Sequence, residues 1–260
     1  MHAIGDLAVD DIAAIFGHAI EVREWHAAEA AAGRAPFRPP DPSAPARRPF
    51  RIEHAQHLSS PEAAATLAHD DIIVVPNPLH LLDDALSAGA KLGPERAASP
   101  GRAFPMRTLA SAGVQIAIAS DWPVVGLDPL LAVHAATTRQ PRGLKGLARS
   151  CDGHGGDAAG SHQSAAQQPC FPWPWIPEES LDSESALMAH TGGAAAALML
   201  EDYVGALREG LRADFVVLDR SPMEVGGDDD TMPPKILATF VDGACAYGCD
   251  RSGPWPWAAG

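Results

Sequence analysis

The sequence predicts an α/β fold made of parallel β/α units, with a small β unit appended at the carboxyl end. Strand and helix signals alternate along residues 1–139, as they do in parallel α/β proteins. The runs 72–75 and 114–120 are continuously aliphatic, which is typical of strands buried on both faces. Near the end, the strand-like segments 215–218 and 236–241 have no helical pattern between them, which indicates the appended β unit.

The first part of the array begins with a helix. Apolar residues recur at helical spacing from Ile12 to Ile20, which predicts a helix over 7–32 that ends at Gly33. Residues 51–54 form a short strand. Ser60 then supplies an N-cap, followed by a proline and an acid, so a second helix is expected to run to about His69.

The middle of the array repeats this order. The strand 72–75 is followed by a long loop and then by a helix over 106–112, which Gly113 ends. The strand 114–120 comes next. Asp128-Pro129 is a typical start for the helix that follows.

The carboxyl-terminal part is predicted to close the fold. A helix over 183–190, continued to about residue 200, precedes the strands 215–218 and 236–241. Asp242-Gly243 is a turn dipeptide after the second strand. We therefore expect one unit over 1–139, a second over 181–248 and a tail over 249–260 without periodicity.

Two segments rich in proline, glycine and alanine interrupt the pattern. The chain has 24 glycines and 24 prolines among 260 residues, and many of them fall in 33–49 and 140–180. These segments contain too little periodic apolar surface to offset the entropy of ordering the backbone. We interpret both as insertions and expect 140–180 to be disordered.

The charge balance excludes some partners. Nineteen Lys and Arg against 33 Asp and Glu give a net charge of −14, which argues against binding to nucleic acid or to an anionic membrane. No apolar run approaches the roughly 18 residues of a membrane helix. The amino terminus resembles no secretory signal, so a cytoplasmic protein is expected, although an organellar address is not excluded.

Four cysteines, at positions 151, 170, 245 and 249, do not suggest a disulfide framework, and a reducing compartment fits this number better. Cys245 and Cys249 have no second pair and no nearby histidine. This spacing argues against a zinc knuckle.

Two residues at predicted strand ends have side chains that bind metals. His54 is the last residue of one strand, and Asp121 follows the strand 114–120. Since the carboxyl ends of parallel strands carry the reactive groups in such folds, we expect the two side chains to converge. Each also has an ordinary interpretation: a hydrogen-bonded core histidine and a turn-forming aspartate.

Neighbouring residues carry the same ambiguity. Glu53 and His57 are candidates to orient a ligand imidazole, or are simply solvated. Trp122 packs against the protein or contacts a substrate.

Five segments, in order, resemble the carboxyl-terminal portion of amidohydrolase family 3, the branch that includes N-substituted formamide deformylases. They are His2–Asp6, Arg51–His57 (RIEHAQH), Pro78–Asp84 (PLHLLDD), Ala119–Val124 (ASDWPV) and Gly205–Asp219 (GALREGLRADFVVLD). They cover most of the chain outside the two insertions.

The resemblance implies a partial TIM-type (β/α) barrel, formed by its last strands, with part of an appended β-sandwich. It also implies a hydrolase of non-peptide carbon–nitrogen bonds in small amide-type substrates that uses one or two divalent metals, usually zinc. By match, His2, His54 and Asp121 are metal ligands, and Asp121 also moves the proton of the attacking water. His80, otherwise an ordinary loop histidine, and Trp122 would face the substrate.

The chain departs from the family pattern at its amino-terminal side. The family's His-x-His pair and its bridging lysine have no counterpart in 1–260. We therefore expect an incomplete site that binds metal weakly and hydrolyses no amide measurably without a chain that supplies the missing barrel half. The alternatives are a degenerate, non-catalytic fragment that serves as an interaction or regulatory module, or a small α/β protein of another fold that mimics the motifs.

Overall fold

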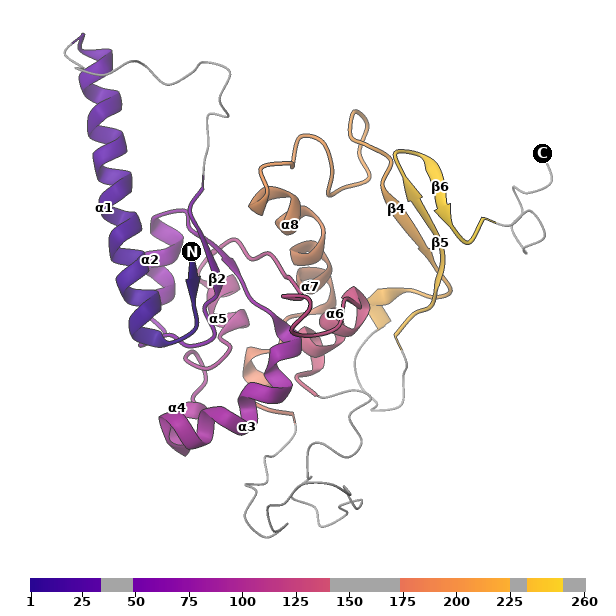
Figure 1. Ribbon diagram of the computed structural model, residues 1–260, viewed down its shortest axis with the longest axis horizontal. Coiled ribbons are helices and arrows are strands. Elements are labelled where there is room, and N and C mark those ends of the chain that lie inside the picture. Colours follow the sequence, from indigo (N-terminus) through magenta and orange to yellow (C-terminus); the bar gives the residue numbers. More distant parts are fainter. Residues whose placement is uncertain (34–48, 141–173, 225–232, 250–260) are drawn as a thin grey trace.

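A parallel β-sheet forms the centre of the computed structural model, which describes residues 1–33, 49–140, 174–224 and 233–249 (Figure 1). Its strands are β1 (His2–Ala3), β2 (Arg51–His54) and β3 (Ile73–Val75), in the spatial order β1-β2-β3. Ala3 lies opposite His54, and Arg51 lies opposite Ile73. All three strands run in one direction, so their carboxyl ends meet at one edge.

A fourth segment continues the sheet beyond β3. Ile116 bridges Val74 in parallel, and the Val74 N–H donates to the Gln115 carbonyl at 3.0 Å. Of the strand predicted over 114–120, the structure has one bridged residue, Ile116. The mixed α/β class is confirmed, and the described residues form an open sheet and not a closed barrel.

Helices cover one face of the sheet. Residues Ile52, Val74 and Ile116 point into the main core, which they share with α1 (Asp6–Ala31), α2 (Ala63–His69) and α5 (Met106–Ser111). The opposite face carries Ile73, Val75 and Ala117, which form a small separate cluster. This alternation is expected of strands buried on both faces.

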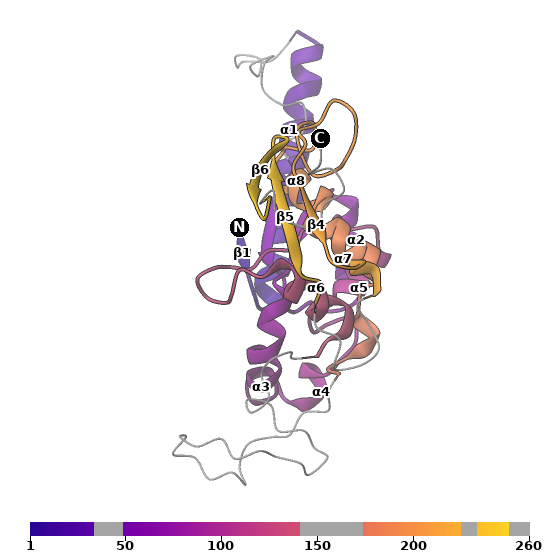
Figure 2. The ribbon, with the colours of Figure 1, turned by 90° about the vertical axis from the view of Figure 1, so that its right-hand side faces the viewer.

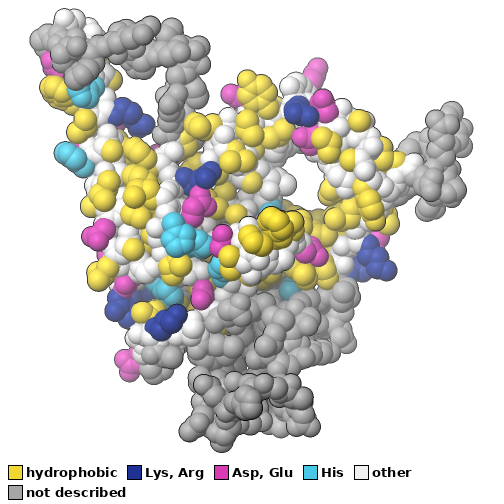
Figure 3. All heavy atoms as spheres, in the orientation of Figure 1, with side chains coloured by type: hydrophobic (Ala, Val, Ile, Leu, Met, Phe, Trp, Pro, Cys, Tyr) yellow, Lys and Arg dark blue, Asp and Glu magenta, His cyan; other side chains and the backbone are white. Residues whose placement is uncertain are grey.

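Helix α1 buries one side and leaves another side apolar and exposed. Val9, Ile12, Ala13 and Phe16 are buried, whereas Leu7, Ile15, Val22 and Trp25 are 71, 56, 40 and 56% exposed. These four residues, here called the α1 stripe, share one side of the helix because they are spaced by close to whole turns. Figure 3 shows hydrophobic side chains along this helix.

The prediction of a long loop between residues 75 and 106 is wrong. This segment contains a 3₁₀ turn (Pro78–His80), α3 (Leu81–Leu92) and α4 (Pro94–Ala97). Leu81, Ala85 and Ala88, spaced by one and two helical turns, are only 1, 0 and 4% exposed. The helical period was therefore present in the sequence, with small residues in place of the usual large ones.

Helix starts were predicted with mixed success. Asp128 caps α6 (Pro129–Thr138) and accepts from the N–H groups of Leu130 and Leu131, as expected. Helix α2, by contrast, begins at Ala63 without a side-chain cap. Ser60 instead accepts the Ala63 N–H through its backbone carbonyl at 3.2 Å, so the Ser-Pro-Glu signal forms a turn ahead of the helix.

The predicted insertion 140–180 extends too far. Trp175 is 1% exposed, and Glu179, at the end of a 3₁₀ turn (Pro177–Glu179), is 3% exposed. The Glu179 carboxylate accepts from the Gly101 N–H at 2.7 Å and from the Thr108 hydroxyl at 2.7 Å. Trp175, Ile176 and Glu179 are therefore part of the core, while residues 141–173 and most of 33–49 lie outside the described residues.

The carboxyl-terminal helices and strands follow the predicted order. Helices α7 (Ser183–His190) and α8 (Gly192–Ala197) precede the strands β4 (Phe215–Leu218), β5 (Ile236–Val241) and β6 (Ala244–Tyr247), with a 3₁₀ turn at Pro222–Glu224. The three strands form an antiparallel sheet in the order β4-β5-β6 (Figure 2). Strand β6 was not predicted, and it pairs directly after the Asp242-Gly243 turn.

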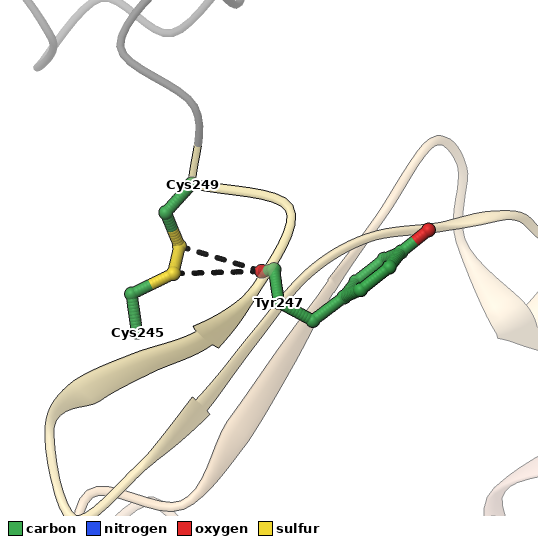
Figure 4. Close-up of a disulfide and its surroundings, with 3 residues drawn as sticks. All are labelled: Cys245, Tyr247 and Cys249. Carbon is green, nitrogen blue, oxygen red and sulfur yellow. Dashed lines mark hydrogen bonds between the residues drawn. A yellow bond between two sulfur atoms is a disulfide. The ribbon is translucent and has the colours of Figure 1, made fainter.

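A disulfide joins Cys245 in β6 to Cys249 just after it, with the Cα atoms 6.2 Å apart (Figure 4). The two sulfur atoms lie 3.5 and 3.4 Å from the Tyr247 carbonyl oxygen. The sequence did not predict this pairing, which joins two neighbouring cysteines. Separately, the described part of the chain contains no helix long and apolar enough to cross a membrane.

Candidate metal centre

His54 and Asp121 lie where two segments end at the carboxyl edge of the sheet. Strand β2 ends at His54, whose φ is 74°, and the segment after Ile116 ends at Asp121, whose φ is 58°. Both backbones leave the extended region at these residues, so each side chain turns over the sheet edge. His54 Nε2 lies 4.0 Å from Asp121 Oδ2, which confirms the predicted convergence of the two side chains.

A third side chain joins them from the 3₁₀ turn that follows β3. His80 Nε2 lies 3.6 Å from Asp121 Oδ2, and the His54 and His80 ring centroids are 5.6 Å apart. One ligand atom from each of the three residues lies within 4.8 Å of the others. Figure 3 shows histidine and acidic side chains together on this face of the molecule.

One ring nitrogen of each histidine in this group lacks a hydrogen-bond partner within the protein. His54 Nδ1 and His80 Nε2 are both buried and make no hydrogen bond. A buried nitrogen without a partner costs about 1–3 kcal/mol, so such atoms indicate a ligand that supplies the missing interaction. Two imidazoles and a carboxylate form a donor set that suits zinc and similar divalent cations.

His2 lies beside the group but outside it. Its ring centroid is 4.3 Å from that of His54, in an edge-to-face arrangement. His2 belongs to β1 and is exposed, and it is not among the three residues whose ligand atoms come together. Its predicted role as a ligand stays a prediction.

Electrostatics keep the central imidazole neutral. Burial lowers the pKa of His54 from its ordinary value, the neighbouring His2 lowers it further, and Asp121 opposes both effects. The lowered pKa favours the neutral imidazole, which is the form with a free lone pair for a metal.

A buried glutamine supports the group and was not predicted. Gln56 is 1% exposed, and its Nε2 lies 3.4 Å from His80 Nδ1. It stands two residues after His54, beyond two residues of positive φ, His54 and Ala55, so no strand period in the sequence indicated where its side chain lies. Asn77 acts nearby, donating from Nδ2 to the Ala119 carbonyl at 3.1 Å, and so ties the end of β3 to the segment that leads to Asp121.

The remaining candidates lie apart from the imidazoles. Glu53 pairs with Arg51, whose guanidinium also donates to the Ala197 carbonyl. His57 is buried, bridges Ala103 and lies edge-on to Phe104. Trp122 follows Asp121 directly and is 64% exposed, so it is accessible to a bound molecule.

The chain is similar to several known proteins. A model described as the amidohydrolase family matches residues 1–247. The chain is 34% identical over 200 residues to Protein LONG AFTER FAR-RED 3 of Arabidopsis thaliana, which covers 77% of this chain and 29% of that protein. It is 27% identical over 150 residues to N-substituted formamide deformylase of Arthrobacter pascens, which covers 58% of this chain and 22% of the other.

Solved structures give the same picture for the fold. An uncharacterized metal-dependent hydrolase from Pyrococcus furiosus superposes with a TM-score of 0.56 and 22% identity, over 86% of this chain and 33% of that one. A corresponding hydrolase from Pyrococcus horikoshii gives 0.54 and 20%, over 86% and 34%. The chain therefore spans about a third or less of the length of these relatives.

Proposed function

Because this chain belongs to the amidohydrolase family, we propose that it carries part of a metal-dependent site that hydrolyses non-peptide carbon–nitrogen bonds in small amide-type molecules. The observation that carries the proposal is the convergence of His54, His80 and Asp121 at the carboxyl edge of the sheet. The name of the Arthrobacter relative, a formamide deformylase, supports an amide-type substrate.

In this proposal the metal is held by His54 and Asp121, with His2 close enough to join them when the sheet is completed. Zinc is the cation that the donor set favours. When bound, such a cation lowers the pKa of water to about 7 and polarises the carbonyl that is attacked.

The protein's own groups move the proton and hold the substrate. Asp121 Oδ2 accepts a proton from the attacking water and returns it to the leaving nitrogen. His80, beside Asp121, donates a hydrogen bond to the substrate carbonyl. Trp122, exposed next to Asp121, packs against the apolar part of the substrate.

We further propose that the site is completed by the remaining part of an amidohydrolase barrel, supplied elsewhere in a longer polypeptide or by a second chain. The chain's share of its relatives' length supports this, as does the geometry of its edge. Strand β1 has a partner on one side only among the described strands, and the adjacent α1 stripe is apolar and exposed.

The same reasoning applies to the second sheet. Among β4, β5 and β6 only Ala238 is buried, and Val216, Val241 and Tyr247 are 50, 47 and 62% exposed. We propose that this sheet is part of a β-sandwich whose second layer comes with the missing barrel strands.

The test is zinc retention and hydrolysis of an N-formyl amide, measured on the 260-residue chain alone and mixed with a polypeptide carrying the amino-terminal part of a related amidohydrolase. We expect weak zinc binding and no measurable hydrolysis alone, and both activities in the mixture. Asp121→Asn should lower hydrolysis by the mixture at least 100-fold, because it removes the proton acceptor.

Asp128→Asn, which changes the aspartate that caps α6, is the matched control and should leave the activity intact. Stoichiometric zinc and turnover by the chain alone would contradict the requirement for a second half. Absence of zinc and turnover in a mixture that does associate would favour the alternative, a non-catalytic interaction module.

A further inference from the structure

The hydrogen bond between Gln56 and His80 decides which nitrogen of His80 carries its proton. A neutral imidazole has one N–H and one lone pair, and the partner of one nitrogen fixes the state of the other. The Gln56 amide Nε2 lies 3.4 Å from His80 Nδ1. An amide NH₂ group only donates, so with the amide in this orientation a neutral His80 ring accepts at Nδ1 and carries its proton on Nε2.

The proton-bearing nitrogen faces the centre of the site. His80 Nε2 is buried, makes no hydrogen bond and lies 3.6 Å from Asp121 Oδ2. An N–H at this position is a donor without a hydrogen-bond partner beside the carboxylate. It has no lone pair in the plane of the ring with which to bind a cation.

From this geometry we infer that Gln56 is a positioning residue that holds His80 in its Nε2–H tautomer, and thereby makes His80 a hydrogen-bond donor to the substrate and not a metal ligand. This inference rests on the proposed function for the identity of the acceptor. The tautomer itself is a property of the metal-free chain.

Gln56 is well placed for this role. Its side chain is 1% exposed, so water does not compete for the imidazole. Its backbone carbonyl accepts from the Phe104 backbone N–H at 2.7 Å, and the backbone N–H of His80 donates to the Asn77 carbonyl at 3.0 Å. Both main chains are thus fixed, and the amide and the ring meet without either having to move.

The two tautomers make opposite predictions for the site. If the Gln56 carbonyl oxygen faced the ring, it would require a proton on Nδ1 and leave a lone pair on Nε2. His80 would then be the third ligand beside His54 and Asp121. The orientation of the Gln56 amide therefore decides between two sites. In one, two residues hold the metal and His80 donates to the substrate; in the other, His80 is a third metal ligand.

The experiment is nitrogen-15 NMR of the full chain labelled at histidine, metal-free, at one fixed pH near 7.5. The His80 signals are assigned by their loss in His80→Asn. We expect a protonated Nε2 and a bare, hydrogen-bonded Nδ1. A proton on Nδ1, alone or together with one on Nε2, would overturn the inference.

Two variants test the role of Gln56. In Gln56→Glu the carboxylate can only accept, so Nδ1 should gain a proton; the matched control Gln115→Glu should leave the His80 signals unchanged. In Gln56→Met, which keeps the volume without the donor, the Nδ1 signal should shift to that of a nitrogen without a hydrogen bond. Unaltered His80 signals in both Gln56 variants would refute the positioning role.

Zinc titration of the labelled chain separates this inference from the proposed function. Perturbed His54 signals with an unchanged His80 tautomer would support both. Transfer of the His80 proton to Nδ1 on adding zinc would overturn the inference and leave the metal site standing. Unperturbed His54 signals, with the Nε2–H tautomer present, would count against the metal site alone.

Discussion

His54 and Asp121 show how single residues at the strand ends build the site. Both have positive φ, 74° and 58°, and so does Ala55, at 44°. A non-glycine residue in this region costs on the order of 1–3 kcal/mol when it is strained. The Ala55 N–H donates to the Ala3 carbonyl at 2.8 Å, and Asn77 ties the neighbouring strand ends together. The hydrogen bonds of the sheet therefore impose these positive φ values, and the intrinsic backbone preferences of the residues do not.

At the same scale, His190 predicts an acid-sensitive stability. Burial lowers its pKa to about 4, and its Nε2 has no hydrogen-bond partner. Above pH 6.5 the imidazole is neutral in both the folded and the unfolded chain. Between pH 6.5 and 4 the unfolded chain takes up a proton that the folded chain does not. The free energy of unfolding therefore decreases as the pH is lowered through this range, by on the order of 3 kcal/mol in all.

The variant His190→Asn should have a shallower loss of stability over this pH range, measured by urea unfolding at pH 7.5, 6.0 and 5.0. Part of the loss should persist, because burial also lowers the pKa of His54 and His57. His18→Asn, which removes a largely exposed imidazole, is the control and should follow the parent. Parallel curves for the parent and His190→Asn would contradict the prediction.

At the scale of elements, buried polar groups join segments that are distant in the chain. Arg139, fully buried at the end of α6, donates from Nε to the Trp175 carbonyl at 2.6 Å and from NH1 to the Phe104 carbonyl at 3.0 Å. Burial lowers the pKa of Arg139 to about 10, while Glu179 opposes this change. These bonds anchor residues 174–180, which composition alone assigned to an insertion.

The contact between α8 and the sheet gives a second prediction. A Cβ added at Gly193 would collide with the Ile116 carbonyl oxygen, whereas one at Gly192 would meet its nearest atom, Met188 Cε, at an ordinary 3.5 Å. Gly193→Ala should therefore destabilise the protein by about 1–3 kcal/mol through overpacking. The measurement is the free energy of unfolding in urea.

Gly192→Ala is the matched control for that contact. It adds the same methyl group to the same helix and should be neutral or stabilising by up to about 1 kcal/mol, because alanine favours helix more than glycine does. Equal effects of the two substitutions would show that α8 does not approach the sheet as described.

For the molecule as a whole, we propose that the α1 stripe and the β1 edge are the surface that the rest of the barrel covers. Ile15→Asp and Trp25→Asp should weaken association with the complementing amino-terminal polypeptide at least 10-fold, measured by analytical ultracentrifugation. Since Ile15 and Trp25 are both 56% exposed, the free energy of unfolding of the chain alone should change by less than about 0.5 kcal/mol.

Leu207→Asp is the control for this surface. Leu207 is 75% exposed, near the antiparallel sheet and outside the α1 stripe. If Leu207→Asp weakened association as much as the two variants in the α1 stripe, the α1 stripe would not be the contact surface.

Much of the fold was predictable because the signals were local. Strand β2, the cap of α6 and the α7–α8 pair follow directly from residue patterns. Helix α3 was missed because alanines replaced the large apolar residues of a typical amphipathic helix. Strand β6 was missed because its four residues are all exposed and show no buried alternation.

The candidate site was predictable in part. His54 and Asp121 could be paired because parallel strand ends meet at one edge, and their separation of 4.0 Å agrees with this. The place of His80 beside Asp121 depended on the 3₁₀ turn after β3, which no pattern indicated. The contact of Gln56 with His80 joins residues 24 positions apart and requires the three-dimensional fold.

The sequence by itself determined most of the order of strands and helices, without α3, α4 and β6, together with the polar residues at the strand ends and the family, because hydrophobic period, turn residues and short motifs are properties of neighbouring positions. Only the tertiary structure decided that part of 174–180 belongs to the core, that His80 completes the group at the sheet edge, and that Gln56 contacts its ring. These outcomes depend on distances between segments far apart in the chain, which are set by packing and by hydrogen bonds to buried groups.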